Sequence, residues 1–140
     1  MQNQFESASN LLPFDGDLYL FSRFYDLKQA DAYYEQLYQQ IDWQSERIWL
    51  YGRWVSVPRL MAWYGDVSAV YRYSGVDHQP VCWTPLLHGL KADLEQFTRC
   101  RFNSVLANLY RDGRDSMGCH ADDEKELGVN PQIASLSFGE

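Results

Sequence analysis

A histidine and an aspartate, His120 and Asp122, stand two residues apart near the end of the 140-residue sequence. On an extended segment, side chains at positions i and i+2 project from the same face, so this pair can reach one ligand together. An imidazole and a carboxylate supply two of the three protein ligands of a 2-His-1-carboxylate iron site. No histidine follows His120 before the sequence stops at Glu140. The residues therefore predict a metal site with two of its ligands in this stretch.

The segment before this pair is expected to be a strand that positions it. Residues 102–110 alternate in character, which is typical of a strand with one buried face. The apolar face is expected to carry Val105, Ala107 and Leu109, and the opposite face Ser104, Leu106, Asn108 and Tyr110. The second face would present the amide of Asn108 and the phenol of Tyr110 to a cavity. A turn over 111–115 follows, and residues 117–122 return as a short strand or a loop.

Two amphipathic helices are expected upstream of that strand. The sequence over Leu27–Gln40 contains no glycine or proline and places apolar residues at steps of three and four, with Asp26 as N-cap. A second helix is expected from Pro85 to about Arg99, with Thr84 as its N-cap. Both are expected to pack on a sheet without taking part in chemistry.

Residues 46–75 combine arginines with aromatic rings. Two strands are expected around the Tyr51-Gly52 turn, and Tyr71 and Tyr73 share a face if their segment is extended. The arginines of this stretch are Arg47, Arg53, Arg59 and Arg72. Such a composition suits a surface that binds phosphates and stacks a base, although a twisted hairpin with solvated arginines would have the same composition.

Two further short strands are expected at residues 18–21 and Ile133–Phe138.

Composition favours one soluble globular domain over residues 1–140, with a mobile polar lead-in at 1–12. No apolar run approaches the roughly 20 residues of a membrane helix. The three cysteines, Cys82, Cys100 and Cys119, are odd in number and widely spaced, which favours a reduced, cytoplasmic protein. The net charge is −7, but residues 42–114 hold nine basic and seven acidic residues. A basic surface is therefore possible in the middle of the chain.

In this order the motifs resemble the AlkB family of Fe(II)- and 2-oxoglutarate-dependent dioxygenases, and most closely its DNA-repair branch. The resemblance runs without a break from about Ile48 to Gly139. It rests on the following matching segments: Tyr51-Gly52-Arg53-Trp54, Pro58-Arg59, Tyr64-Gly65-Asp66, Tyr71-x-Tyr73-Ser74-Gly75, Asn108-x-Tyr110-x-Asp112-Gly113, His120-x-Asp122-Asp123-Glu124 and Pro131-x-Ile133-Ala134-Ser135-Leu136-Ser137-Phe138-Gly139.

The resemblance implies an enzyme that demethylates alkylated bases in DNA with Fe(II), 2-oxoglutarate and O2, releasing formaldehyde, succinate and CO2. His120 and Asp122 would bind the iron, and Asn108 and Tyr110 would hydrogen-bond 2-oxoglutarate. The implied fold is α+β and mostly β, a double-stranded β-helix (jelly roll) with helices packed on one side. In this chain the roll would be incomplete.

The same resemblance assigns substrate contacts. Tyr73 would stack on the flipped base opposite the His120 ring, and Tyr71 would line that pocket. Asp123 and Glu124 would face the edge of the cationic base. The remaining contacts fall in the nucleotide-recognition segment, residues 46–75: Tyr51, Gly52 and Arg53 form a turn that probes the duplex, Arg59 binds phosphate, and Arg72 stands between the two tyrosines.

In the AlkB family the distal iron-binding histidine and the arginines that clamp 2-oxoglutarate come after the segment that matches Ile133–Phe138. We therefore expect the 140 residues alone to show little turnover. One alternative is a catalytically incomplete nucleic-acid-binding module, and another is the same chemistry on RNA or protein. The expected partner is alkylated DNA, with no membrane and a monomeric state.

Overall fold

Two capped helices form as the sequence predicts. The computed structural model describes residues 8–69, 71–73, 76–121 and 127–139. Helix α1 spans Leu27–Gln40, and the Asp26 side chain accepts a 2.8 Å hydrogen bond from the backbone N–H of Gln29. The Gln29 side-chain oxygen in turn accepts a hydrogen bond from the Asp26 N–H, which completes a capping box.

Helix α2 spans Pro85–Thr98. The Thr84 hydroxyl accepts a 3.2 Å hydrogen bond from the N–H of Leu87, and Pro85 occupies the first turn, where its missing N–H costs nothing. The helix ends at Arg99, which adopts a left-handed conformation with φ +62°. The predicted extents and caps of both helices are confirmed. Neither helix, nor any other described helix, has the length and apolar character that crossing a membrane would require.

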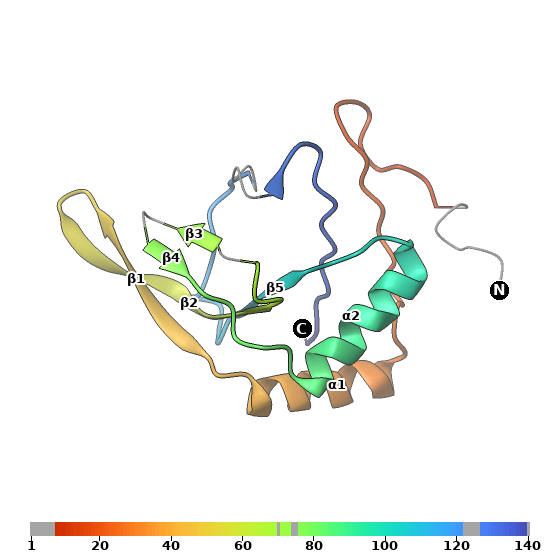
Figure 1. Cartoon of the computed structure of the whole chain (residues 1–140), viewed down its shortest axis with the longest axis horizontal. Helices are drawn as coiled ribbons and strands as arrows, with labels where there is room; N and C mark the ends of the chain where they lie inside the picture. Colours follow the sequence, from red (N-terminus) through yellow and green to blue (C-terminus); the bar gives the residue numbers. More distant parts are fainter. Residues whose placement is uncertain (1–7, 70, 74–75, 122–126, 140) are drawn as a thin grey trace.

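A three-stranded antiparallel sheet has the order β1-β2-β5 (Figure 1). Strand β1 spans Gln44–Leu50, the long central strand β2 spans Arg53–Gly65, and β5 spans Ser104–Leu109. A separate two-stranded ribbon pairs β3, Tyr71–Tyr73, with β4, Val76–His78. The turn between β1 and β2 is the predicted Tyr51-Gly52 turn, and its end of the hairpin projects from the rest of the molecule (Figure 1).

The pairing of β1 with β2 is interrupted once. Ser45 pairs with Leu60 and Arg47 with Ser56, so three residues of β2, 57–59, lie opposite the single residue Glu46. Proline has no N–H to give to a sheet and is tolerated at such bulges, which explains why Pro58 can sit within a central strand. The bulge separates the projecting part of the hairpin from the part that joins the core.

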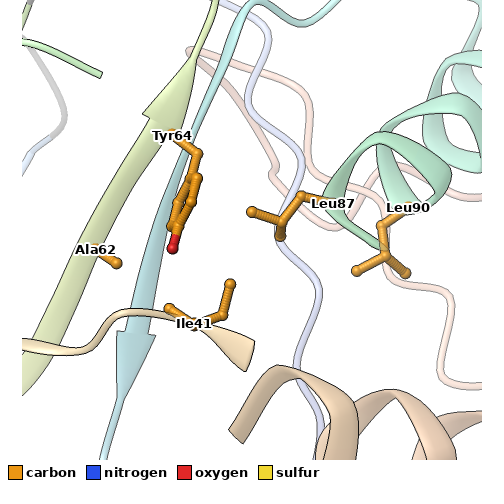
Figure 2. Close-up of a cluster of buried hydrophobic side chains, with 5 residues drawn as sticks. All are labelled: Ile41, Ala62, Tyr64, Leu87 and Leu90. Atoms are coloured by element: carbon orange, nitrogen blue, oxygen red, sulfur yellow. The ribbon is translucent and has the colours of Figure 1, made fainter. Parts of the chain in front are cut away.

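The core lies between the sheet and the helices. Ile41, Ala62, Tyr64, Leu87 and Leu90 form its buried cluster, and Figure 2 shows Ala62 and Tyr64 of the sheet facing the leucines of α2. The buried Tyr64 hydroxyl accepts a 3.1 Å hydrogen bond from the N–H of Asp42, so its polar end is satisfied. Val105 and Ala107 of β5 pack on the same cluster, which confirms the predicted core face of this strand.

Two predicted strands are wrong. Residues 18–21 form no strand, because their backbone is used locally: the Asn10 side-chain oxygen accepts hydrogen bonds from the N–H groups of Leu12 and Leu18, and Leu11 bonds to Leu18. A side chain that binds nearby backbone groups competes with pairing into a sheet. Phe21 instead packs edge-to-face on Phe97, with ring centroids 4.8 Å apart.

Ile133–Phe138 also forms no strand in the described structure. Its side chains nevertheless alternate as predicted, with Leu136 and Phe138 against the core and Ile133 exposed. The Phe138 ring lies 6.1 Å from that of Tyr25 and 6.0 Å from that of Tyr33, by centroids. Side-chain packing against the helical side, rather than a backbone ladder, therefore holds this segment.

Candidate metal and nucleic-acid site

The candidate site starts on the face of the sheet turned away from the helices. Asn108 pairs with Met61 across β5 and β2 and is exposed, whereas its neighbour Ala107 packs on the core. Successive side chains of a strand alternate between faces, so Asn108 belongs to the outer face. Tyr110 comes directly after β5 and is 47% exposed. The predicted core face is confirmed for Val105 and Ala107, and the predicted polar face for Asn108 and Tyr110.

A turn held by two ion pairs follows Tyr110. Arg111 contacts both carboxylate oxygens of Asp115, at 2.7 and 2.8 Å, and its backbone N–H donates to the same carboxylate at 2.9 Å. The Arg114 guanidinium likewise donates to both carboxylate oxygens of Asp112, and its shortest contact, from Nη2 to Oδ2, is 2.7 Å. The hydrogen bond from Arg111 lowers the pKa of Asp115 to about 2, and that from Arg114 lowers the pKa of Asp112. Both carboxylates therefore stay ionised near neutral pH.

The chain then passes beside the bulge of β2. The N–H of Ser116 donates a 3.0 Å hydrogen bond to the carbonyl oxygen of Pro58, which brings the loop that carries His120 next to Arg59. Residues 117–121 are irregular, so the predicted return after the turn is a loop. This hydrogen bond joins the predicted metal-binding loop to the base of the hairpin.

The exposed His120 ring has a defined partner. Its Nδ1 lies 2.9 Å from the carbonyl oxygen of Gly118. A carbonyl oxygen can only accept, so this contact requires a proton on Nδ1 and places the lone pair of the neutral ring on Nε2. Histidines that bind metals commonly use this arrangement to fix their tautomer. Within the described residues, no three His, Cys, Asp and Glu side chains gather as a metal cluster. The predicted Asp122, Asp123 and Glu124 lie outside those residues.

Arg59 is buried, with only 7% of its surface exposed. Among the described residues its polar contact is a 3.0 Å approach of Nε to the Met61 sulfur, which is a weak acceptor. A buried guanidinium held by a thioether has much of its hydrogen-bonding capacity left for an anion. The role of Arg59 in phosphate binding stays a prediction, and this environment is compatible with it.

The tip of the β1–β2 hairpin is strained. Tyr51 is 95% exposed, and Tyr51 and Gly52 have φ values of +49° and +79°, as the tight turns of two-residue hairpins require. Glycine adopts this conformation freely, but a bulky residue such as tyrosine does so at a cost of roughly 1–2 kcal/mol. Backbone strain of this kind concentrates at functional sites. Arg53 begins β2 directly after the turn and is exposed.

Behind the tip, the sequence prediction overlooked a pair of tryptophans. Trp49 and Trp54 face each other across the two strands with ring centroids 5.4 Å apart and planes at 71°. The signal in the sequence was their symmetric placement about the two-residue turn at Tyr51-Gly52.

The third predicted element, Tyr71–Tyr73, forms β3 as an extended segment. The structure describes only the backbone of residues 71–73, so the predicted contacts of Tyr71, Arg72 and Tyr73 stay predictions. The segment that leads to β3 is held by β2, because the Trp63 indole donates a 3.1 Å hydrogen bond to the carbonyl oxygen of Ala69.

A comparison with known families decides the assignment. The model of the 2OG-Fe(II) oxygenase superfamily matches residues 17–140. The chain belongs to this superfamily. Its jelly-roll architecture accords with the small antiparallel sheet and the two helices described above.

Curated relatives confirm the resemblance to the AlkB family. The DNA oxidative demethylase ALKBH2 of Bos taurus is 39% identical over 114 residues, which cover 79% of this chain and 41% of the relative. The alpha-ketoglutarate-dependent dioxygenase alkB homolog 3 of Mus musculus is 44% identical over 121 residues, covering 86% of this chain and 42% of the relative. ALKBH2 of Arabidopsis thaliana is 36% identical over 129 residues, covering 88% and 40%. The chain thus spans less than half the length of these relatives.

Proposed function

We propose that this chain supplies the nucleotide-recognition segment and part of the iron site of an AlkB-type dioxygenase that removes alkyl groups from bases in DNA. The observation that carries the proposal is the hydrogen bond from Ser116 to Pro58, because it places the His120 loop at the base of the hairpin. The metal-binding loop and the proposed phosphate-binding residue Arg59 would then serve one nucleotide. The names of the relatives, a DNA oxidative demethylase and alpha-ketoglutarate-dependent dioxygenases, support the same chemistry.

His120 and Asp122 are proposed to bind Fe(II), with Asn108 and Tyr110 hydrogen-bonding 2-oxoglutarate. The fit rests on the donor set: the Gly118 carbonyl fixes the His120 tautomer that offers Nε2, and Asn108 stands on the outer face of the sheet. Fe(II) and 2-oxoglutarate, when bound, supply the O2-dependent oxidation of the alkyl carbon, with release of formaldehyde, succinate and CO2. The side chains of this site would position the cofactor.

The substrate would be held by three groups of side chains. Tyr51, Gly52 and Arg53 probe the duplex at the strained tip, and Arg59 takes a phosphate at the bulge. Base flipping costs a few kcal/mol and is easiest at a damaged pair. The ribbon residues Tyr71, Arg72 and Tyr73 would line and stack the flipped base, and the carboxylates of Asp123 and Glu124 would face its cationic edge.

We further propose a single oxygenase domain, an incomplete roll with its helices on one side, that acts as a cytoplasmic monomer. All three cysteines are free thiols, and Cys82 and Cys119 are exposed, as a reducing compartment would allow. Sedimentation of the purified chain as a dimer would contradict the monomeric state.

Formaldehyde release from a methylated oligonucleotide tests the chemistry. We expect little release by the 140-residue chain with Fe(II) and 2-oxoglutarate, because the sequence holds no histidine or arginine after His120 to complete the site. A chimera that continues with the remaining C-terminal part of mouse alkB homolog 3 should release formaldehyde and lose this activity on His120→Ala. A folded chimera without activity would contradict the proposed chemistry, and robust turnover by the 140-residue chain would contradict the incomplete site.

A nucleic-acid-binding module without catalysis is the second candidate. The exposed hairpin with Tyr51, Trp49 and Trp54 favours it, since these aromatics do not depend on a metal. This candidate predicts salt-sensitive binding of DNA by the chain and no consumption of 2-oxoglutarate by the chimera.

A further inference from the structure

The outward face of the hairpin carries two large aromatic rings in solvent. Trp49 is 59% exposed and Trp54 is 57% exposed. Their pair is the second one from a two-residue turn, a non-hydrogen-bonded position at which side chains approach most closely. Because the planes meet at 71°, the edge of one ring rests on a face of the other. The pair is therefore ordered, while ring surface on its outer side stays open.

Packing on the core does not explain these rings. The opposite face of the same hairpin makes the inward contacts, since Ile48 and Val55 are half-buried and Val57 is buried. An edge-to-face pair adds about 0.5–1.5 kcal/mol to hairpin stability, and smaller residues that favour strands would supply part of this at an exposed position. The exposed area of two indoles is thus larger than a structural role requires.

The charge around the pair suits a polyanion. Arg47 is two residues before Trp49 and on the same face of β1, where it is exposed and has no acidic partner among the described residues. Arg53 is exposed at the tip. Glu46, the acid of this hairpin, belongs to the opposite face. In a chain of net charge −7, a face with arginine and two open rings is a local exception.

We propose that Trp49, Trp54 and Arg47 bind an unpaired base and its phosphate in single-stranded nucleic acid. The proposal rests on the proposed function and extends it to the strand that flanks the lesion. Open indole faces stack on bases of any sequence, but in a duplex the neighbouring bases already cover those faces. The hairpin would then favour single-stranded or locally opened substrates over intact duplex.

Fluorescence anisotropy with labelled oligonucleotides, measured on the 140-residue chain, tests this without turnover. We expect the double variant Trp49→Thr/Trp54→Thr to bind single-stranded oligothymidylate about tenfold more weakly or worse, since stacking on each base is lost. Threonine keeps the strand propensity. Trp49→Phe/Trp54→Phe keeps an aromatic pair and should stay within about threefold of wild type. Arg47→Gln should reduce the slope of log K against log salt by roughly one phosphate contact.

Tyr38→Leu is the matched control, because it removes a ring that is 54% exposed on α1. It should leave the affinity unchanged, and affinity for duplex should be the same in wild type and the threonine variant. Unchanged single-strand affinity in the folded threonine variant would overturn the proposal, as would an equal loss for duplex. If the wild-type chain bound no oligonucleotide, the proposed function would fail as well; if it bound but ignored both indoles, only this inference would fail.

Discussion

The backbone N–H of Ser116 and the carbonyl oxygen of Pro58 are joined by a hydrogen bond of 3.0 Å. The bond links the end of the ion-paired turn to the bulge of β2. Pro58 lies in the bulge, outside the regular pairing of β2 with β1. Its carbonyl oxygen is therefore free to accept a hydrogen bond from another segment. The loop that leads to His120 is thus bonded to β2 at the one stretch of the hairpin where the β1–β2 register is interrupted.

Asp115→Asn should loosen this attachment. Asp115 binds the side chain and the backbone N–H of Arg111, and its side chain is only 8% exposed. We expect faster hydrogen exchange of the Ser116 amide, measured by NMR. Asp112→Asn is the control, because the Asp112 side chain is 45% exposed and the exchange of Ser116 should change less. Equal acceleration in the two variants would show that Asp115 has no special role.

The same turn should respond to acid. The pKa of Asp115 is lowered from 3.8 to about 2 by its hydrogen bond to Arg111. A carboxyl with a lowered pKa contributes stability above its ordinary pKa and loses it as the pH falls through the lowered value. Protection of the Ser116 amide should therefore be constant above about pH 4 and decline between about pH 4 and 2. Loss of protection between pH 7 and 5 would point to another group.

Tyr51→Asn should make the chain more stable. Asparagine tolerates positive φ better than tyrosine, so urea unfolding should show a gain of about 0.5–1 kcal/mol. Gly52→Ala, at φ +79° with open space around its Cβ position, should lose about 1 kcal/mol through backbone strain alone. A loss of stability in Tyr51→Asn would mean that the tyrosine ring makes contacts that outweigh its strain.

Gly65→Ala should disturb the pairing that positions Asn108. A Cβ at Gly65 would meet the Asn103 carbonyl oxygen at 2.8 Å and the Ser104 Cβ at 2.9 Å, so β2 and β5 would have to separate. Thermal or urea unfolding should show a loss of about 1–3 kcal/mol. Gly89→Ala in α2, where a Cβ meets nothing within 4 Å, should instead gain about 0.5–1 kcal/mol. Opposite signs in the two variants are the decisive result.

Tyr64→Phe isolates one hydrogen bond of the core. The lost hydroxyl leaves the N–H of Asp42 without its 3.1 Å partner, which should cost about 1 kcal/mol in urea unfolding. Tyr38→Phe removes an exposed hydroxyl from α1 and should be neutral. A neutral result at Tyr64 would indicate that water replaces the phenol.

Local signals made much of this fold predictable. Asp26 and Thr84 mark the helix starts in the sequence, because a capping side chain binds a backbone N–H only two or three residues further on. The turn at Tyr51-Gly52 and the alternation in β5 are equally local. The strand predicted at residues 18–21 failed because the Asn10 side chain takes backbone donors of that region, and the one at Ile133–Phe138 failed because aromatic packing replaces a ladder. Alternation reports which side chains are buried, but it does not report whether a partner strand is present.

The site was predictable to a smaller extent. The motif that contains His120 and the strand with Asn108 could be found in the sequence, since motif spacing and strand periodicity are local. The bond from Ser116 to Pro58 joins segments far apart in sequence. The burial of Arg59 and the bulge depend on how β2 packs and pairs. No residue pattern within one segment encodes them. Trp49 and Trp54 became a pair only through the register of the hairpin.

Strand β2 runs without interruption from the tip of the hairpin, at Arg53, to Gly65 beside the core. A force that acts on the tip is therefore transmitted to the core along one continuous strand. The bulge at Pro58 is where that backbone is least supported by β1, so bending should concentrate there. Because Ser116 is attached at the same residue, deflection of the hairpin by a bound strand would displace the His120 loop in the same movement.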